Sequence, residues 1–286
     1  MVLGLLVLMQ WPIQEVARPL VAEPGMSEVE VAVAAASASR WYDADSRTRA
    51  MPPGSASSAA TAEIAGRYGL FQGLEVSVAL PWIARLDPAG GDPVSGAGRA
   101  ELGARYELPW PGTTWTETGE RIPPPFRVSG DVAVVLPSTA RRLRTDDAGV
   151  VHKDHLAAAG AVRVKHHVSD HAAAHAFAGF IAPFANAEDR EAERDPPSSF
   201  TLSAGSTYQA TARLWADVTA SFTRTNRDRV AGGVVPRTDQ FLVRLEPAAG
   251  LAIARNVDVA IRLAVPLAGK NTPQSFTLSS EARVRF

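Results

Sequence analysis

Residues 275–286 read SFTLSSEARVRF, and two kinds of side chain alternate along this stretch. One parity carries the mostly apolar residues Phe276, Leu278, Ala282, Val284 and Phe286. The other parity carries the polar or charged residues Thr277, Ser279, Glu281, Arg283 and Arg285. Because successive side chains of a β-strand point to opposite faces, the stretch predicts a strand with one apolar and one charged face.

The same alternation recurs upstream, and helical periodicity is nearly absent beyond roughly the first twenty residues. Clear examples are residues 28–35, 74–82, 99–108, 126–136 and 257–265. Residues 172–184 also favour a strand, although their many alanines leave the inward-facing parity open. We therefore expect about twelve strands, most of them close to the ~9–11 residues that cross a bilayer at a tilt.

The connections between these strands alternate in length. Short ones lie near residues 69–73, 168–170, 209–212 and 254–256. Long ones, rich in Pro, Gly, Ser and charge, lie at residues 43–58, 86–97, 138–151, 185–197 and 226–237. Membrane barrels have short periplasmic turns and long outer loops, and an even strand number leaves both chain ends in the periplasm. Only Pro109–Pro125 is long where a short turn is expected.

These patterns predict an all-β fold, a transmembrane antiparallel up-and-down β-barrel over residues 26–286, in the outer membrane of a Gram-negative bacterium. Aromatic residues near the strand ends favour two interfacial girdles. The outer group is Trp41, Trp82, Phe184, Phe222 and Phe241. The periplasmic group is Tyr68, Tyr106, Trp110, Phe126, Tyr208 and Phe286. The alternative is that aromatic residues simply end strands, as they do in other β proteins.

Composition narrows the function classes. A net charge of −1 argues against a nucleic-acid binder, which usually has a basic excess. The absence of cysteine excludes a disulfide scaffold, thiol catalysis and a cysteine metal site. Val2–Met9, the longest apolar run, resembles the hydrophobic part of a secretory signal, with an ordinary buried segment as the alternative. We expect residues 1–25 to be a signal-like or disordered segment.

The polar strand faces supply the candidate functional residues. Those expected to line the lumen are Arg67, Glu75, Arg99, Glu101, Arg105, Arg127, Asp131, Arg163, Lys165, Arg244, Glu246, Arg262, Glu281 and Arg283. One interpretation is a mixed-charge filter that orients a polar or amphipathic solute. The other is a lumen that these charges plug by pairing with one another.

Histidines and hydroxyl residues were weighed for other chemistry. His166, His167, His171 and His175 flank a short turn and are weak candidates for a metal site or a pH-sensitive gate. A polar turn that happens to be rich in histidine is the simpler interpretation, so no metal and no cofactor is expected. Ser169, Asp170 and His171 are adjacent on the chain and cannot converge as a catalytic triad. We expect no enzymatic activity and no catalytic residues.

Two further features point to a family. The chain ends on Phe286 in an alternating strand, which resembles the signal that the barrel-assembly machinery recognises. The stretches Arg67–Leu70, Leu74–Val76, Pro81–Trp82, Gly98–Tyr106 and Val134–Ser138 are similar to motifs of an outer-membrane family associated with the phenol meta-cleavage pathway. The family's usual Gly-Asp is here Gly98-Arg99. The resemblance covers roughly residues 60–286 and implies a barrel that transports hydrophobic or aromatic compounds.

The leading hypothesis is a channel for passive passage of small solutes, hydrophobic or aromatic ones among them. Its expected partners are outer-membrane lipid, the barrel-assembly machinery and an unidentified small-molecule solute, and no nucleic acid. Two alternatives stay open at this point. One is a non-conducting structural or adhesion barrel, and the other is a soluble secreted β-sandwich that binds a ligand.

Overall fold

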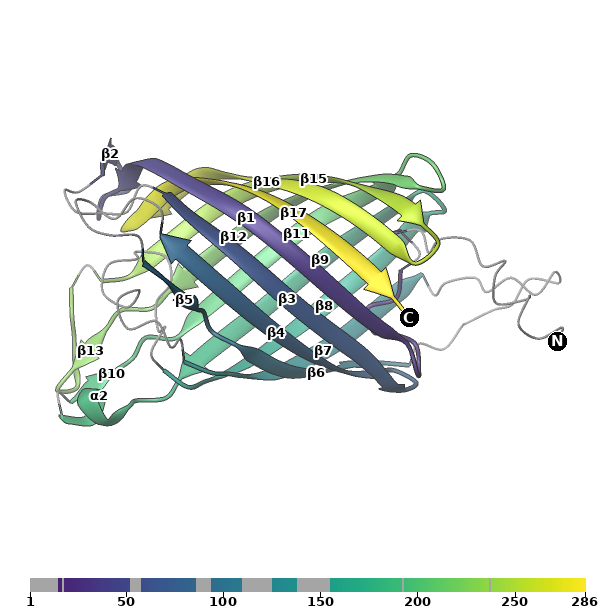
Figure 1. The fold of residues 1–286 in the computed structure, drawn as a ribbon. Coiled ribbons are helices and arrows are strands. Elements are labelled where there is room, and N and C mark those ends of the chain that lie inside the picture. The colour runs from purple at the N-terminus through teal and green to yellow at the C-terminus, as the bar shows by residue number, and fades with distance from the viewer. Residues whose placement is uncertain are drawn as a thin grey trace, which may run out of the picture.

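The protein is a closed β-barrel (Figure 1). The computed structural model describes residues 15–16, 18–51, 58–85, 94–109, 125–137, 155–191, 193–236 and 238–286. Within these residues, twelve antiparallel strands form the wall, and the last of them, β17, pairs with the first, β1. The predicted fold class is confirmed. A soluble β-sandwich is excluded, because the sheet closes on itself.

Each wall strand pairs with its neighbours along the chain. In order around the barrel they are β1 Ser27–Tyr42, β3 Ser58–Phe71, β4 Leu74–Arg85, β6 Glu101–Glu107, β7 Phe126–Val135, β8 Ala157–Ser169, β9 Ala172–Pro183, β11 Ser199–Gln209, β12 Leu214–Thr225, β15 Gln240–Ala254, β16 Val257–Lys270 and β17 Thr272–Arg285. The closing pair runs from Glu28 opposite Arg285 to Tyr42 opposite Thr272. A bulge between Ala38 and Trp41 interrupts that register.

Smaller elements lie outside this ring. β2 (Thr48–Ala50) pairs with β1, and β5 (Val94–Ala97) pairs with β4. β10 (Arg194–Asp195), β13 (Arg229–Val230) and β14 (Gly233–Val234) form a separate small sheet next to the short helix α2 (Ala187–Glu191). They all gather at the end of the barrel opposite the chain termini (Figure 1). No helix in the described residues is long and apolar enough to cross a membrane.

The two ends of the barrel differ in their connections. At the end where β1 begins and β17 ends, the β3–β4, β8–β9, β11–β12 and β15–β16 connections are short turns. We call this the periplasmic end, since membrane barrels keep their short turns there. The outer end has the longer connections, with one exception. Asn271 alone joins β16 to β17, in a left-handed conformation with φ 50° that asparagine tolerates.

In contrast to a soluble protein, the wall carries apolar side chains on its outside and charged ones on its inside, as the alternation predicts. Val31, Val132 and Ile261 point outward and are 47%, 66% and 60% exposed. Glu75 and Arg127 point inward and are buried. This apolar outer belt, on a closed barrel, places the protein in the outer membrane. The open question about β9 is also answered, because Phe180 points outward while His175 and Phe177 point inward.

Many of the aromatic residues expected in the two girdles are exposed on the outside of the wall, whereas Trp41, Phe222 and Phe241 are half-buried. Trp82 and Phe184 are outward and exposed, and Phe200, Phe222 and Phe241 stack in a row toward the outer end. At the periplasmic end the exposed aromatics are Tyr68, Tyr106, Phe126, Tyr208 and Phe286. Trp110, Val2–Met9 and most of Pro109–Pro125 lie outside the described residues.

Candidate functional site: a polar lumen with an internal strap

The N-terminal segment enters the barrel. We use the word strap for residues 15–16 and 18–26, which cross the inside of the periplasmic end. Lys165 on β8 donates its ammonium to the carbonyl oxygens of Glu15 (2.7 Å) and Arg18 (3.0 Å). His167 Nε2 lies 2.7 Å from the Val16 carbonyl oxygen, and Val16 is only 1% exposed. The strap lies within the segment that the sequence suggested to be signal-like or disordered.

Two strands near β8 also hold the strap. On β4, Glu75 accepts a hydrogen bond from the Ala22 amide at 2.7 Å. On β6, Arg105 donates to the Leu20 carbonyl oxygen at 3.0 Å. From the other side of the ring, Arg283 on β17 lies 3.6 Å from the Glu15 carboxylate. Five wall strands separate β17 from β8 in either direction, so the strap spans the lumen.

Gly69 belongs to the Arg67–Leu70 motif, and the strap accounts for the glycine at this position. The strap crosses β3 at this residue, where the Gly25 amide donates to the Gly69 carbonyl oxygen and the Gly69 amide donates to Met26. A Cβ atom at position 69 would lie 2.1 Å from the backbone oxygen of Glu23. Only glycine allows so close an approach of two backbones.

Ion pairs pack the periplasmic half of the lumen around the strap. Glu28 binds Arg18, Arg67 and Arg285, with the Arg285 contact at 3.0 Å. Asp258 binds Arg285 and Arg283, both at 3.0 Å. Apart from the half-buried Arg67, these side chains are buried, so each charge depends on its partners for the stabilisation that water would otherwise supply.

Two further carboxylates, one on β7 and one on β12, bind several polar groups each. Asp131 on β7 accepts from Arg105 and from Arg163, both at 2.7 Å. Asp217 on β12 binds His175 at 2.7 Å. Its oxygens also accept from the hydroxyls of Thr207 and Thr219, both at 2.8 Å. The sequence indicates the charged members of this group, and the hydroxyls share their inward parity.

Two cavities remain beside the strap. One of about 570 Å³ borders β1, β3, β4 and β6 and includes Glu30, Glu63 and Glu101. The other, of about 560 Å³, borders β9, β11, β12, β15 and β16 and includes a row of hydroxyl residues. Glu15 and Leu20 of the strap line both cavities. The strap therefore lies between two open parts of the lumen.

Most of the charged residues expected in the lumen line these cavities. They are Arg67, Glu75, Glu101, Arg105, Arg163, Lys165, Arg244, Glu246, Arg262, Glu281 and Arg283. Of the others, Arg127 pairs with Glu107 at 3.3 Å, Asp131 pairs with Arg105 and Arg163, and Arg99 lies half-buried between β5 and β6. Whether any of them acts on a solute stays a prediction.

Several lumen residues were not among the expected ones. Glu15 and Arg18 belong to a segment set aside as signal-like. Thr201, Ser203, Ser221 and Thr223 also line the lumen; they are uncharged but share the polar parity of β11 and β12. Parity alone would have found the hydroxyls. No local pattern in the sequence indicates that the strap folds into the barrel.

The four candidate histidines do not come together. His175 faces the lumen and binds Asp217, whereas His166 packs against the ring of Phe126, 4.9 Å between centroids. His167 contacts the strap, and His171 is exposed in the β8–β9 turn. The described residues contain no group of three His, Asp or Glu side chains placed to hold a metal ion.

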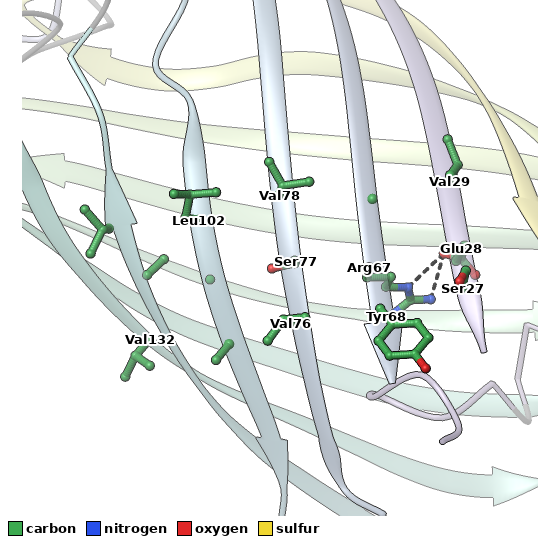
Figure 2. A pocket seen from close by; sticks show the side chains of 15 residues that line it. Ser27, Glu28, Val29, Arg67, Tyr68, Val76, Ser77, Val78, Leu102 and Val132 are labelled. Carbon is green, nitrogen blue, oxygen red and sulfur yellow. Dashed lines mark hydrogen bonds and ion pairs between the residues drawn. The ribbon is translucent and has the colours of Figure 1, made fainter. Parts of the chain in front are cut away.

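A further groove lies on the outside of the wall and does not belong to the lumen. Figure 2 shows it over β1, β3, β4, β6 and β7, with Val29, Tyr68, Val76, Val78, Leu102 and Val132 among its side chains. These apolar side chains belong to the outward parity, so the groove faces lipid. Arg67 and Glu28, joined by dashed lines in the same view, belong to the inward ion-pair cluster.

Known structures share this fold. The COG4313 outer membrane channel from Pseudomonas putida F1 matches with a TM-score of 0.67 and 15% identity, over 93% of this chain and 97% of that one. The NanC porin matches with a TM-score of 0.55 and 6% identity, over 90% and 98%. The KdgM porin in complex with disordered oligogalacturonate gives 0.50 and 6%, over 91% and 99%. No protein-family model and no curated protein matches the chain.

Proposed function

We propose that the protein is an outer-membrane channel through which small solutes diffuse along the two sides of the strap. The observation that carries the proposal is the pair of cavities inside the barrel, about 570 and 560 Å³, that the strap separates without filling. Their walls are polar, so water and a hydrated solute can occupy them. The barrel supplies the passage and the strap narrows it.

We further propose small, weakly polar compounds, aromatic ones among them, as the solutes. The motif resemblance to the phenol-pathway family supports this class. Part of the outer half of the lumen also fits it, because several inward positions there carry small side chains. On β1 and β8 these are Ala34, Ala36, Ala157 and Ala159. A flat ring meets little obstruction there before it reaches the charged half.

A non-conducting barrel is the second candidate. The ion pairs around Glu28 and Asp258, together with the strap, occupy the periplasmic end and favour a plugged lumen. The two candidates differ in conductance. Purified protein, refolded in detergent and inserted into planar bilayers, should give discrete current steps in KCl solution. Protein that is folded and inserted, as judged by its gel mobility before and after heating, yet gives no steps would overturn the channel.

A further inference from the structure

Arg244 is a lumen arginine for which the described residues supply no ion-pair partner. It lies on β15 and faces the cavity lined by hydroxyl residues. Glu246, two residues along the same face, is already engaged by the Ser221 hydroxyl at 2.7 Å and by Arg262 at 3.8 Å. In the described part of the chain Arg244 has no salt bridge, and its Nε–H is a buried donor without an acceptor. Buried donors of this kind are uncommon and call for an acceptor.

Hydroxyl groups surround this guanidinium on one side. Ser221 on β12 is the register partner of Arg244, and Thr223 follows on the same inward face. The next strand, β11, brings Thr201 within 3.1 Å of the Thr223 hydroxyl. All of these groups line the same cavity as Arg244. The Ser221 hydroxyl donates its hydrogen to Glu246, but the Thr201–Thr223 pair keeps one hydroxyl hydrogen free. A guanidinium with such a donor nearby is suited to bind a carboxylate, which accepts hydrogen bonds at both oxygens.

The charges around Arg244 favour a small ligand that carries a single negative charge. Arg262 and Glu246 offset each other, so Arg244 supplies about one unit of uncompensated positive charge to this cavity. Five wall strands separate β15 from β6 in either direction, so the two lie opposite each other. Glu101 on β6 has no salt bridge among the described residues and repels a second negative charge on the ligand.

We propose that Arg244 and the hydroxyl pair of Thr223 and Thr201 form a binding site for the carboxylate of a small organic monoacid at the outer part of the lumen. The inference deepens the proposed function, because it names the anionic members of the solute class. The acid's ring or chain lies along the small side chains of the outer lumen. Arg244 is then the residue that determines specificity for acids over neutral compounds.

Block of the chloride current by benzoate tests the site. Added to the wild-type channel, benzoate should reduce the current in a saturable way, and the neutral benzamide should not. In Arg244→Gln the apparent dissociation constant of benzoate should rise about tenfold or more, since a charge-assisted hydrogen-bonded pair is lost. Arg244→Lys keeps the positive charge but cannot donate two parallel hydrogen bonds to one carboxylate. Its apparent dissociation constant should therefore lie between those of the wild type and Arg244→Gln.

Arg224→Gln is the matched control. Arg224 lies on the same hairpin, one residue after Thr223, but on the exposed outer face opposite Phe241. Its replacement removes the same charge without touching the lumen, and benzoate block should stay at the wild-type level. Equal block in wild type and Arg244→Gln, or an equal loss in the two glutamine variants, would overturn the site.

A binding measurement separates failure of the site from failure of the channel. Titration calorimetry of benzoate into the detergent-refolded barrel needs no conductance. A sealed barrel that binds benzoate, and loses that binding in Arg244→Gln, would retain the site and overturn the channel. A conducting barrel without benzoate binding in calorimetry would overturn the site alone.

Discussion

Glu75 is the residue at which the strap and two wall strands meet. It is 1% exposed and accepts hydrogen bonds from the Ala22 amide and from Arg105 at 2.9 Å, with Arg67 at 3.7 Å. Its carboxylate thus neutralises wall charge and anchors the strap. Glu28 and Asp258 are likewise buried beside arginines.

Replacing Glu75 with alanine should therefore destabilise the barrel. Two arginines and one backbone amide lose an acceptor, and removal of one partner from a buried ion pair costs about 3–5 kcal/mol. Because Asp131 still binds Arg105, we expect the lower part of that range. Urea unfolding in lipid vesicles measures the change. Glu191→Gln, at the exposed end of α2, should leave the midpoint unchanged, and an equal midpoint for both variants would contradict the anchoring role.

Asp239, just before β15, gives a residue-scale effect of pH. A hydrogen bond from Lys270 (2.9 Å) holds the pKa of this carboxyl below its usual range against the opposing effect of burial, with Arg227 adding to it. A lowered folded-state pKa means that the stabilisation is present above the unfolded value, about 3.9, and is lost as the pH falls through the folded value.

The outer ends of β15 and β16 should accordingly loosen only below about pH 4. Hydrogen exchange of the backbone amides of residues 240–243 and 268–271, measured as the pH is lowered, checks this after correction for the intrinsic exchange rate. Asp239→Asn should exchange faster at neutral pH and lose the acid-dependent component. An unchanged acid response in that variant would show that other groups cause it.

At the scale of elements, the strap depends on one close crossing. Gly69 on β3 leaves no space for a side chain beneath the strap, whereas a Cβ atom at Gly66, on the same strand, would make only an ordinary contact of 3.6 Å with Val78. Alanine variants at the two positions therefore distinguish displacement of the strap from a general disturbance of β3.

Gly69→Ala should displace the strap and raise the single-channel conductance, because the element that narrows the lumen leaves the wall. Gly66→Ala should conduct like the wild type. Planar-bilayer recordings of the two variants make the comparison, and limited proteolysis of residues 15–26 reports the release directly. If both alanine variants show wild-type conductance and the same resistance to proteolysis, the crossing does not hold the strap.

At the scale of the whole molecule, side chains on the outward face of the wall must be compatible with lipid. Those on the inward face must be compatible with water. Val132 is 66% exposed on the outer face of β7, and Ala133 follows it on the inner face. Arginine at a lipid-facing position near the middle of the bilayer costs about 2–4 kcal/mol. The same substitution in the lumen leaves its charge in a polar space.

Val132→Arg should therefore fold poorly into vesicles, and Ala133→Arg should fold as the wild type does. The heat-modifiable gel shift after refolding over a range of urea concentrations gives the folded fraction of each. Efficient folding of Val132→Arg would contradict the assignment of the outer face. The role of Phe286 in assembly stays a prediction; its backbone pairs with Ser27 while its ring is 71% exposed.

The sequence by itself determined the barrel, its approximate strand number, the face of nearly every strand and the end at which short turns lie. Each of these follows from period-two alternation or from the length of a connection, which are local properties. The same patterns identified charged lumen residues such as Arg105 and Asp131, because parity alone directs a side chain inward. They left the inward face of β9 undecided, because alanines occupy both faces of that strand.

Only the tertiary structure decided which lumen charges are paired and what lies among them. Pairing across strands depends on register around the closed ring, and Glu28 meets Arg285 only because the last strand returns to the first. The position of the strap depends on backbone contacts with Lys165, Gly69 and Arg105, which have no repeating pattern. Arg244 could not be singled out from the sequence for the same reason, because the absence of an ion-pair partner depends on the residues that surround it in the folded barrel.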